Sequence, residues 1–198
     1  MLEVRRHIMI IGHSYVYWAA CYAASSPWGK DLGLGAHAFI SWKGMCGVQW
    51  LQFGRMTSFE RIPPDILVVH LGGNDLPKVP GKALILDILR DLKRLKEKYP
   101  TMQIVWSTII PCLTWRGAQS FDNVNRARRQ VNREVCRGVS RGGLRSVINH
   151  RRIQLSNREY FCGDGVHLSD AGLDIFLDDI RGGLLVELGR LGGYMGHS

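Results

Sequence analysis

The fold is decided by the stretch Ile-Met-Ile-Ile-Gly-His-Ser, which occupies residues 8–14. Its first four residues form a short apolar run, and such runs are typical of strands buried on both faces inside a parallel sheet. In open α/β sheets the functional residues lie just beyond the carboxyl ends of the strands. Ser14 therefore occupies a position where a nucleophile could lie. Taken alone, the stretch is also explained by a plain strand-to-helix turn in which Ser14 caps the next helix.

The chain has 198 residues, enough for one domain with a substantial core, and we expect a single domain over residues 1–198. The formal net charge is +9. Much of this charge lies between Arg126 and Arg152, where nine arginines accompany a single acidic residue, Glu134. Such a segment is usually a solvated face, but it could also attract nucleic acid.

The five cysteines are scattered, odd in number and never spaced as Cys-x-x-Cys. This pattern favours reduced thiols in an intracellular setting, cytoplasmic or nuclear, and argues against a zinc site. The apolar N-terminal segment resembles a signal peptide, but His13 and Ser14 interrupt it, and cleavage near residue 25 would remove the first strand. No run of residues is long and apolar enough to predict a membrane span.

Further strands and helices alternate along the chain. Periodicity, glycines and prolines predict strands over residues 36–42, 65–71, 103–110 and 144–149. Helices are predicted over residues 15–24, 48–59, 83–98 and 123–137, with a closing helix that starts at residues 169–170. This alternation predicts a three-layer α/β domain with a parallel sheet.

Polar residues follow successive elements of this predicted sheet. Ser14 follows the first strand, a glycine (Gly44 or Gly47) follows the second, and Asn74 follows the third, while the segment 164–167 precedes the last helix. Because the carboxyl ends of parallel strands share one edge, these groups should converge. Acyl transfer needs a serine, a histidine to take its proton, a carboxylate to orient that histidine, and donors for an oxyanion. Each motif alone is more simply explained as a turn or as a structural histidine.

The four blocks together resemble the SGNH (GDSL-like) hydrolase superfamily, over the range from Ile8 to Ile180. The resemblance implies a flavodoxin-like, three-layer α/β/α fold with a five-stranded parallel sheet and a serine esterase or acylhydrolase acting on a small acyl or acetyl ester, without metal or cofactor. The blocks are Gly12-His13-Ser14, Met45-Cys46-Gly47, Gly72-Gly73-Asn74-Asp75 and Asp164-Gly165-Val166-His167.

The resemblance also implies roles for these residues. Ser14 would be the nucleophile, His167 the general base, and Asp164 the residue that orients His167. The oxyanion hole would be formed by the Ser14 N–H, the N–H of Gly47, with Gly44 as the alternative, and the side-chain amide of Asn74.

One residue departs from the family pattern, because His13 stands where the family usually has aspartate. This leaves open how the nucleophile turn is held and whether the site is active. Two sequence motifs are similar to those of SGNH domains in vertebrate retroelements and in genes derived from them. They are Gly-His-Ser-Tyr-Val at residues 12–16 and Asp-Gly-Val-His-Leu-Ser at residues 164–169.

Two further hypotheses concern binding. Trp115 and Arg116 follow the fourth predicted strand, so we expect them to flank the same edge as Ser14, with Arg116 facing the acyl or leaving group; a surface loop with a half-buried tryptophan explains them equally well. The alternative function is a weakly active or inactive module of this fold that binds nucleic acid through the Arg126–Arg152 region. No RNA-recognition motif, zinc finger or helix-turn-helix signature supports a dedicated nucleic-acid domain.

Overall fold

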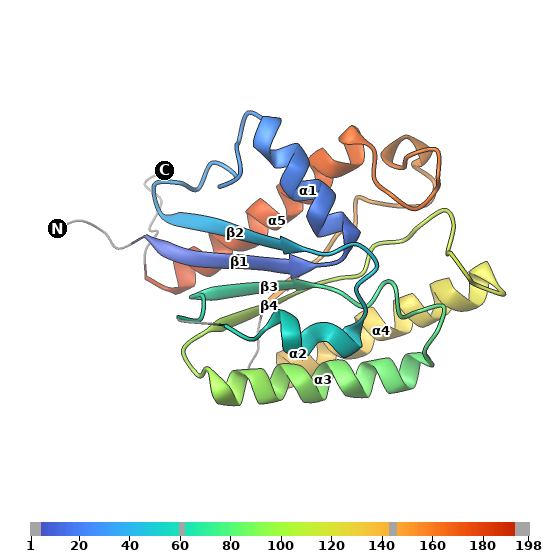
Figure 1. The fold of residues 1–198 in the computed structure, drawn as a ribbon, viewed down its shortest axis with the longest axis horizontal. Coiled ribbons are helices and arrows are strands. Elements are labelled where there is room, and N and C mark those ends of the chain that lie inside the picture. Colours follow the sequence, from blue (N-terminus) through green and yellow to red (C-terminus); the bar gives the residue numbers. More distant parts are fainter. Residues whose placement is uncertain (1–4, 60–61, 143–145, 193–198) are drawn as a thin grey trace.

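The computed structural model of the protein describes residues 5–59, 62–142 and 146–192. In this part of the chain five strands form one sheet with all neighbours parallel, in the order β2-β1-β3-β4-β5. Helices cover both faces of the sheet and give three layers (Figure 1). The expected α/β/α architecture is confirmed, and the strand order is the flavodoxin-like one. The strands are β1 (Arg6–Gly12), β2 (Ala38–Gly44), β3 (Ile66–His70), β4 (Gln103–Ser107) and β5 (Ser146–Ile148).

The helices are divided between the two faces of the sheet. Helices α1 (Ser14–Ser25) and α5 (Asp170–Arg190) pack together on one face, and α3 (Gly81–Lys98) and α4 (Phe121–Arg141) pack together on the other (Figure 1). Helix α3 buries apolar residues at helical spacing, and α4 buries a row of valines while its arginines, except the half-buried Arg128, are exposed. No described helix is long and apolar enough to cross a bilayer.

Several predicted boundaries were wrong. The predicted helix over 48–59 is only a 3₁₀ turn, Trp50–Gln52, followed by the single-turn helix α2 (Phe53–Met56). The weak helix former Gly54 lies in this turn. Helix α4 extends beyond the predicted 123–137 at both ends. At its N-terminus Ser120 caps the helix by accepting a hydrogen bond from Asn123 N at 3.3 Å.

Two predicted strands are shorter than expected. The strand over 103–110 ends at Ser107, although the N–H of Thr108 still donates to the carbonyl of Ile148 at 3.0 Å. The strand over 144–149 is observed as Ser146–Ile148, and its first two residues lie outside the described residues. The other predicted elements agree with the structure to within three residues at the ends predicted for them.

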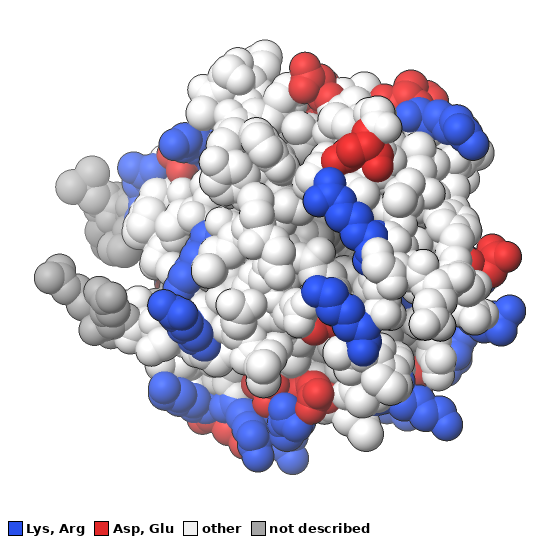
Figure 2. Space-filling model, turned by 45° about the vertical axis from the view of Figure 1, so that its right-hand side comes forward, with Lys and Arg blue, Asp and Glu red and all other residues white. Residues whose placement is uncertain are grey.

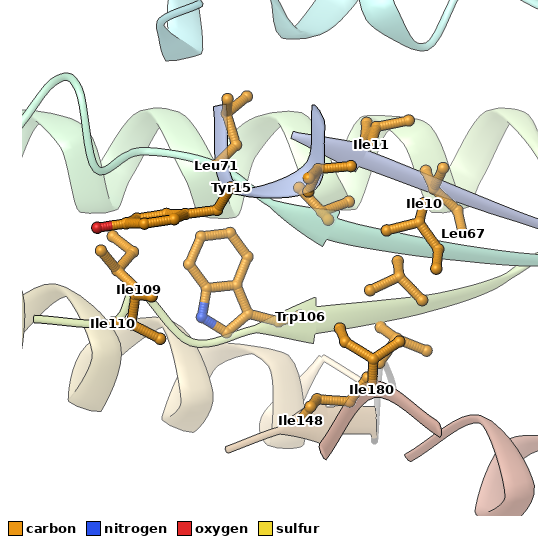
Figure 3. Close-up of a cluster of buried hydrophobic side chains, with 14 of the residues drawn as sticks. Ile10, Ile11, Tyr15, Leu67, Leu71, Trp106, Ile109, Ile110, Ile148 and Ile180 are labelled. Atoms are coloured by element: carbon orange, nitrogen blue, oxygen red, sulfur yellow. The ribbon is translucent and has the colours of Figure 1, made fainter. Parts of the chain in front are cut away.

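The core lies between the sheet and its helices and reaches the carboxyl edge of the strands. All residues of β3 are buried, and the indole of Trp106 on β4 is fully enclosed. In Figure 3 Trp106 lies between strand side chains such as Ile10 and Leu67 on one side and Tyr15, Ile109 and Ile110 on the side toward which β4 points. The apolar core therefore continues directly into the floor of the edge where functional residues are expected.

The strand order creates a switch point between β1 and β3. From β1 the chain passes to α1 on one face of the sheet, and from β3 it passes to α3 on the other face (Figure 1). The loops that follow these two neighbouring strands therefore diverge and leave a crevice, which is where open α/β sheets bind ligands. Ser14 follows β1 and Asn74 follows β3, so both residues lie at this crevice.

Candidate active site

The turn that carries Ser14 is held by backbone hydrogen bonds. Ser14 is the first residue of α1, and His13, not Ser14, is its N-cap residue. The N–H of Val16 donates to the carbonyl of His13 at 3.0 Å, and the N–H of Met45 donates to the carbonyl of Gly12 at 3.0 Å. A Cβ atom at Gly12 would lie 2.3 Å from the carbonyl oxygen of His70, so only glycine fits there. The N–H of Ser14, at the helix N-terminus, has no intrahelical acceptor and is available to an oxyanion.

Asp164 and His167 lie in one tight loop before α5. The carboxylate Oδ2 of Asp164 is 2.6 Å from Nδ1 of His167, and its Oδ1 accepts from the backbone N–H groups of Val166 and His167, each at 2.9 Å. Burial alone would raise the pKa of Asp164, but these hydrogen bonds and the nearby imidazole outweigh it and lower the pKa to about 2. The carboxylate is therefore ionised at neutral pH and can accept a proton from Nδ1. In the neutral tautomer with its proton on Nδ1, the imidazole presents Nε2 as an acceptor.

Tyr15 joins the nucleophile turn to the histidine loop. Its buried hydroxyl donates a hydrogen bond to the carbonyl of Val166, directly before His167, and lies 3.1 Å from Sγ of Cys112. Burial raises the pKa of Tyr15 well above its ordinary value, and the neighbouring Cys112 thiol raises it further, so the hydroxyl stays a donor. No local sequence pattern marks Tyr15, because its role depends on a partner 151 residues away.

The glycine loop and the Asn74 turn are also tied together. The side-chain amide of Asn74 donates to the carbonyl of Val48 at 2.9 Å, and the N–H of Trp50 lies 3.0–3.1 Å from both carboxylate oxygens of the buried Asp75. Burial raises the pKa of Asp75 to about 6, against the opposing effect of the Trp50 N–H. One N–H of the Asn74 amide is used in this link, and the second remains for a ligand.

The two candidate glycines of this loop differ in their surroundings. Gly47 has a φ of +75°, and nothing lies within 4 Å of the Cβ position, so its backbone is open to a ligand. At Gly44 a Cβ atom would lie 2.2 Å from the backbone nitrogen of Tyr17, because β2 packs directly against α1 there. Gly44 is thus a packing residue, and Gly47 remains the candidate oxyanion donor.

The candidate residues meet around one cavity of about 390 Å³. No hydrogen bond joins Ser14 to His167 among the described residues, and Asp164 lies behind His167, outside the cavity lining. Catalytic hydrogen bonds are often loose before a substrate binds. The predicted residues that line the cavity are Ser14, Gly47, Asn74, Trp115, Arg116 and His167.

Arg116 has an additional partner that sequence analysis did not predict. Its guanidinium Nη2 lies 3.3 Å from Oδ2 of Asp164, the same oxygen that contacts His167. The arginine side chain is 71% exposed, so this ion pair is weak and its guanidinium is free to turn toward the cavity. Trp115, in contrast, is buried against the cavity wall.

His13 is buried next to Ser14 as a neutral side chain. Burial lowers the pKa of His13 to about 4, with a smaller contribution from His167, and neither ring nitrogen has a hydrogen-bond partner among the described residues. Its ring lies 5.0 Å from that of Tyr15 and 5.2 Å from that of His70, measured between centroids. The backbone, and not the side chain that replaces the usual aspartate, therefore holds the nucleophile turn.

Behind His13 a polar chain runs through the core. Oγ of Ser107 lies 2.9 Å from Nδ1 of His70 and 2.8 Å from Nε2 of His150, and Nδ1 of His150 lies 3.1 Å from the carboxylate of Asp179. Burial lowers the pKa of both His70 and His150, so these imidazoles are neutral at neutral pH. No group of three or more His, Cys, Asp or Glu residues in the described part of the chain is arranged to hold a metal ion.

Charged side chains are spread out on the face of the molecule that Figure 2 shows. Figure 2 brings this side of the molecule forward, and lysine and arginine side chains lie scattered between uncharged ones.

Acidification should destabilise the protein through His13. The folded protein keeps this imidazole neutral until the pH approaches about 4, whereas the unfolded chain protonates it near pH 6.5. The unfolded state therefore binds more protons in this window, and the free energy of unfolding should fall by about 3 kcal/mol between pH 6.5 and 4 through this residue alone. Denaturant unfolding of wild type and His13→Asn across this range should give a shallower pH dependence in the variant.

The slope is the decisive quantity, because the asparagine also changes packing and can shift the stability at every pH. Equal slopes for the two proteins would show that His13 carries none of the acid sensitivity. The remaining slope in the variant is expected to combine the other buried imidazoles, His70 and His150, with Asp75, whose raised pKa acts in the opposite direction.

The chain is similar to known proteins in its sequence pattern and in its fold. The chain matches the model of the GDSL-like Lipase/Acylhydrolase family over residues 10–175. No curated protein matches the chain in sequence. Among solved structures, a GDSL-like lipase from Bacteroides thetaiotaomicron is similar with a TM-score of 0.70 and 14% identity, over 89% of this chain and 86% of that one.

Two esterase structures are similar as well. A family 3 carbohydrate esterase from Clostridium thermocellum has a TM-score of 0.68 and 14% identity, over 95% of this chain and 99% of that one. A mutant acetyl esterase with an acetate ion, in which one serine is replaced by alanine, has a TM-score of 0.69 and 16% identity, over 94% and 99%. At such identities the likeness establishes the fold alone. Since the family model spans most of the sequence, however, the chain belongs to the GDSL-like lipase/acylhydrolase family, whose members are hydrolases.

Proposed function

We propose that the chain is a serine esterase that hydrolyses a small acyl or acetyl ester with Ser14, His167 and Asp164. The observation that carries the proposal is the cavity around which Ser14, Asn74 and His167 converge from three distant parts of the chain. The contact of Asp164 with Nδ1 of His167 supports it, because it favours the tautomer in which Nε2 can act as a general base.

The mechanism follows from these positions. Ser14 Oγ attacks the ester carbonyl while His167 Nε2 takes its proton, and the imidazolium is stabilised by the carboxylate of Asp164. The oxyanion accepts hydrogen bonds from the N–H groups of Ser14 and Gly47 and from the amide of Asn74. His167 then protonates the departing alcohol, and a water molecule that it activates hydrolyses the acyl-serine, which regenerates Ser14.

The size and lining of the cavity support a small acyl group. Its volume of about 390 Å³ lies near the lower end of the range for small-molecule sites. Tyr15, Ile109, Ile110 and Trp115 give it an apolar wall. An acetyl or other short acyl chain gains burial there without needing a charged partner.

The central test is hydrolysis of p-nitrophenyl acetate by wild type and by Ser14→Ala. We expect kcat/KM to fall by about 10³-fold or more in the variant, because only oxyanion stabilisation and binding remain. Ser25→Ala, at the exposed end of the same helix, is the matched control and should keep wild-type activity.

A fluorophosphonate probe gives an independent readout that does not require the natural substrate. Intact mass should show one adduct on wild type and on Ser25→Ala, and none on Ser14→Ala. The proposal fails when Ser14→Ala turns over the ester as fast as wild type.

We further propose that Trp115 and Arg116 contact the substrate. Both line the cavity, and the exposed guanidinium of Arg116 can exchange its contact with Asp164 for an anionic group on the ester. Arg116→Gln should then raise KM for esters with an anionic leaving group by about 5-fold, the strength of an exposed ion pair, and leave KM for neutral esters unchanged. Arg94→Gln, an exposed arginine on α3, is the control.

Steady-state kinetics on paired neutral and anionic esters measures this difference. A fall in kcat for both esters with unchanged KM would contradict substrate contact and assign Arg116 to holding Asp164 instead.

Nucleic-acid binding is the second candidate function. One observation favours it, an exposed row of arginines along α4, although Glu134 pairs with two of them at 2.9 and 3.1 Å. We expect single-stranded RNA to bind in fluorescence anisotropy with an affinity that falls steeply as salt rises. Replacing three unpaired members of the row by glutamine should weaken binding, and unchanged affinity would end this candidate. The row comprises Arg126, Arg129, Arg133, Arg137 and Arg141.

An intracellular location and the similarity to retroelement domains stay predictions. All five cysteines are free, and Cys21, Cys46 and Cys162 are exposed, which supports a reducing compartment as part of the proposal.

A further inference from the structure

A second cavity lies beside the candidate active site. It has a volume of about 860 Å³ and is formed by the residues that follow β4, by α4, and by the segment 149–156 that follows β5. Ile109 and Ile110 are the two lining residues that it shares with the cavity at Ser14. The two cavities are therefore neighbours with one apolar wall in common, and we call the second one the α4 groove.

The α4 groove is lined by cations without acidic residues. Arg128, Arg133 and Arg151 line it, and no aspartate or glutamate does. Glu134 on α4 pairs with Arg133 at 2.9 Å, but Arg128 and Arg151 have no carboxylate partner within the described residues. The groove thus holds two uncompensated positive charges.

Arg128 is fixed in a half-buried position. Its Nη1 donates to the carbonyl of Ile109 at 3.1 Å, and its Nε donates to Oδ1 of Asn125 at 3.3 Å. Burial lowers the pKa of Arg128, and the neighbouring Arg129 lowers it further, yet a guanidinium remains charged at neutral pH. A partly desolvated cation without a counter-charge is costly, and an anion in the groove would relieve that cost.

The nearby carboxylates of Asp178 and Asp179 pair with Arg152 and not with the arginines of the groove. Asp178 and Asp179 lie 2.7 and 2.5 Å from Arg152, which does not line the groove. His150 lines the groove, but burial lowers its pKa and keeps the imidazole neutral at neutral pH, so it adds no charge. Any negative charge that neutralises Arg128 and Arg151 must therefore come from a ligand or from solvent ions.

We propose that the α4 groove binds a phosphate-bearing ligand through Arg128 and Arg151, with Arg133 as a further donor. Guanidinium groups pair with phosphate through two parallel hydrogen bonds, and a phosphomonoester carries nearly two negative charges at neutral pH, which matches the two unpaired cations. The groove volume is within the range of sites that hold nucleotide-sized molecules. This site is separate from the proposed ester chemistry and does not depend on Ser14.

The first experiment is calorimetric titration of the whole chain with pyrophosphate at constant ionic strength. Wild type should bind saturably, and Arg151→Gln should weaken binding at least about 10-fold, since an ion-paired hydrogen bond is lost. Arg151 is exposed, so its variant is expected to fold. Arg126→Gln, on α4 but outside the groove lining, is the matched control and should bind as wild type does.

Two further variants test whether binding needs the guanidinium of Arg128 and whether it is independent of Ser14. Arg128→Lys keeps the positive charge but replaces the planar guanidinium, which can form two parallel hydrogen bonds with phosphate. This variant should also weaken pyrophosphate binding. Ser14→Ala should bind pyrophosphate normally, whatever its effect on ester hydrolysis. Absence of saturable binding, or equal losses in Arg151→Gln and Arg126→Gln, would overturn the proposal.

A competition arm identifies the source of the phosphate. A single-stranded oligonucleotide that displaces pyrophosphate from wild type, and binds less tightly to Arg151→Gln, would assign the groove to phosphodiester ligands. A mononucleotide that displaces pyrophosphate when the oligonucleotide does not would assign it to small phosphate esters. Either result supports a phosphate site. The proposal is contradicted if sodium chloride, added to the ionic strength of the competitor solution, displaces pyrophosphate as well as the competitor does.

Discussion

The geometry of the site depends on the parallel pairing of β1 with β2 on one side and with β3 on the other. Gly12 pairs with Gly44 and with His70, so three strands end at the same level of the sheet. The loops that follow β1 and β3 then diverge to opposite faces and open the crevice between Ser14 and Asn74. Without this register, the residues of the candidate site would not face one another.

The sheet sets the approximate positions of the loops at the candidate site, and hydrogen bonds between the loops hold them there. Tyr15 links the Ser14 turn to the histidine loop through the carbonyl of Val166, and Asp75 links the Asn74 turn to Trp50. Both side chains are buried, which makes the bonds costly to break and keeps the loops in place. The site is thus built from loops whose positions are set by buried polar contacts.

The same principle explains why the departure at His13 does not dismantle the nucleophile turn. The turn is held by its own backbone and by the contact of Met45 with Gly12, while the imidazole packs as a neutral group between Tyr15 and His70. Burial keeps this imidazole neutral above its lowered pKa, and the cost of protonating it is added only in acid. The replacement therefore trades a charged side chain beside the nucleophile for an acid-sensitive one.

The sequence by itself determined the fold class, because short apolar runs such as residues 8–11 and 66–69 alternate with helical patterns, and this alternation favours strands buried on both faces of a parallel sheet. It also predicted which motifs meet at the carboxyl edge, since that follows from strand direction alone. Only the tertiary structure decided the contact of Tyr15 with Val166, the pairing of Arg116 with Asp164, and the groove at Arg128. These depend on side chains brought together from distant parts of the chain, and no local pattern of residues encodes such distances.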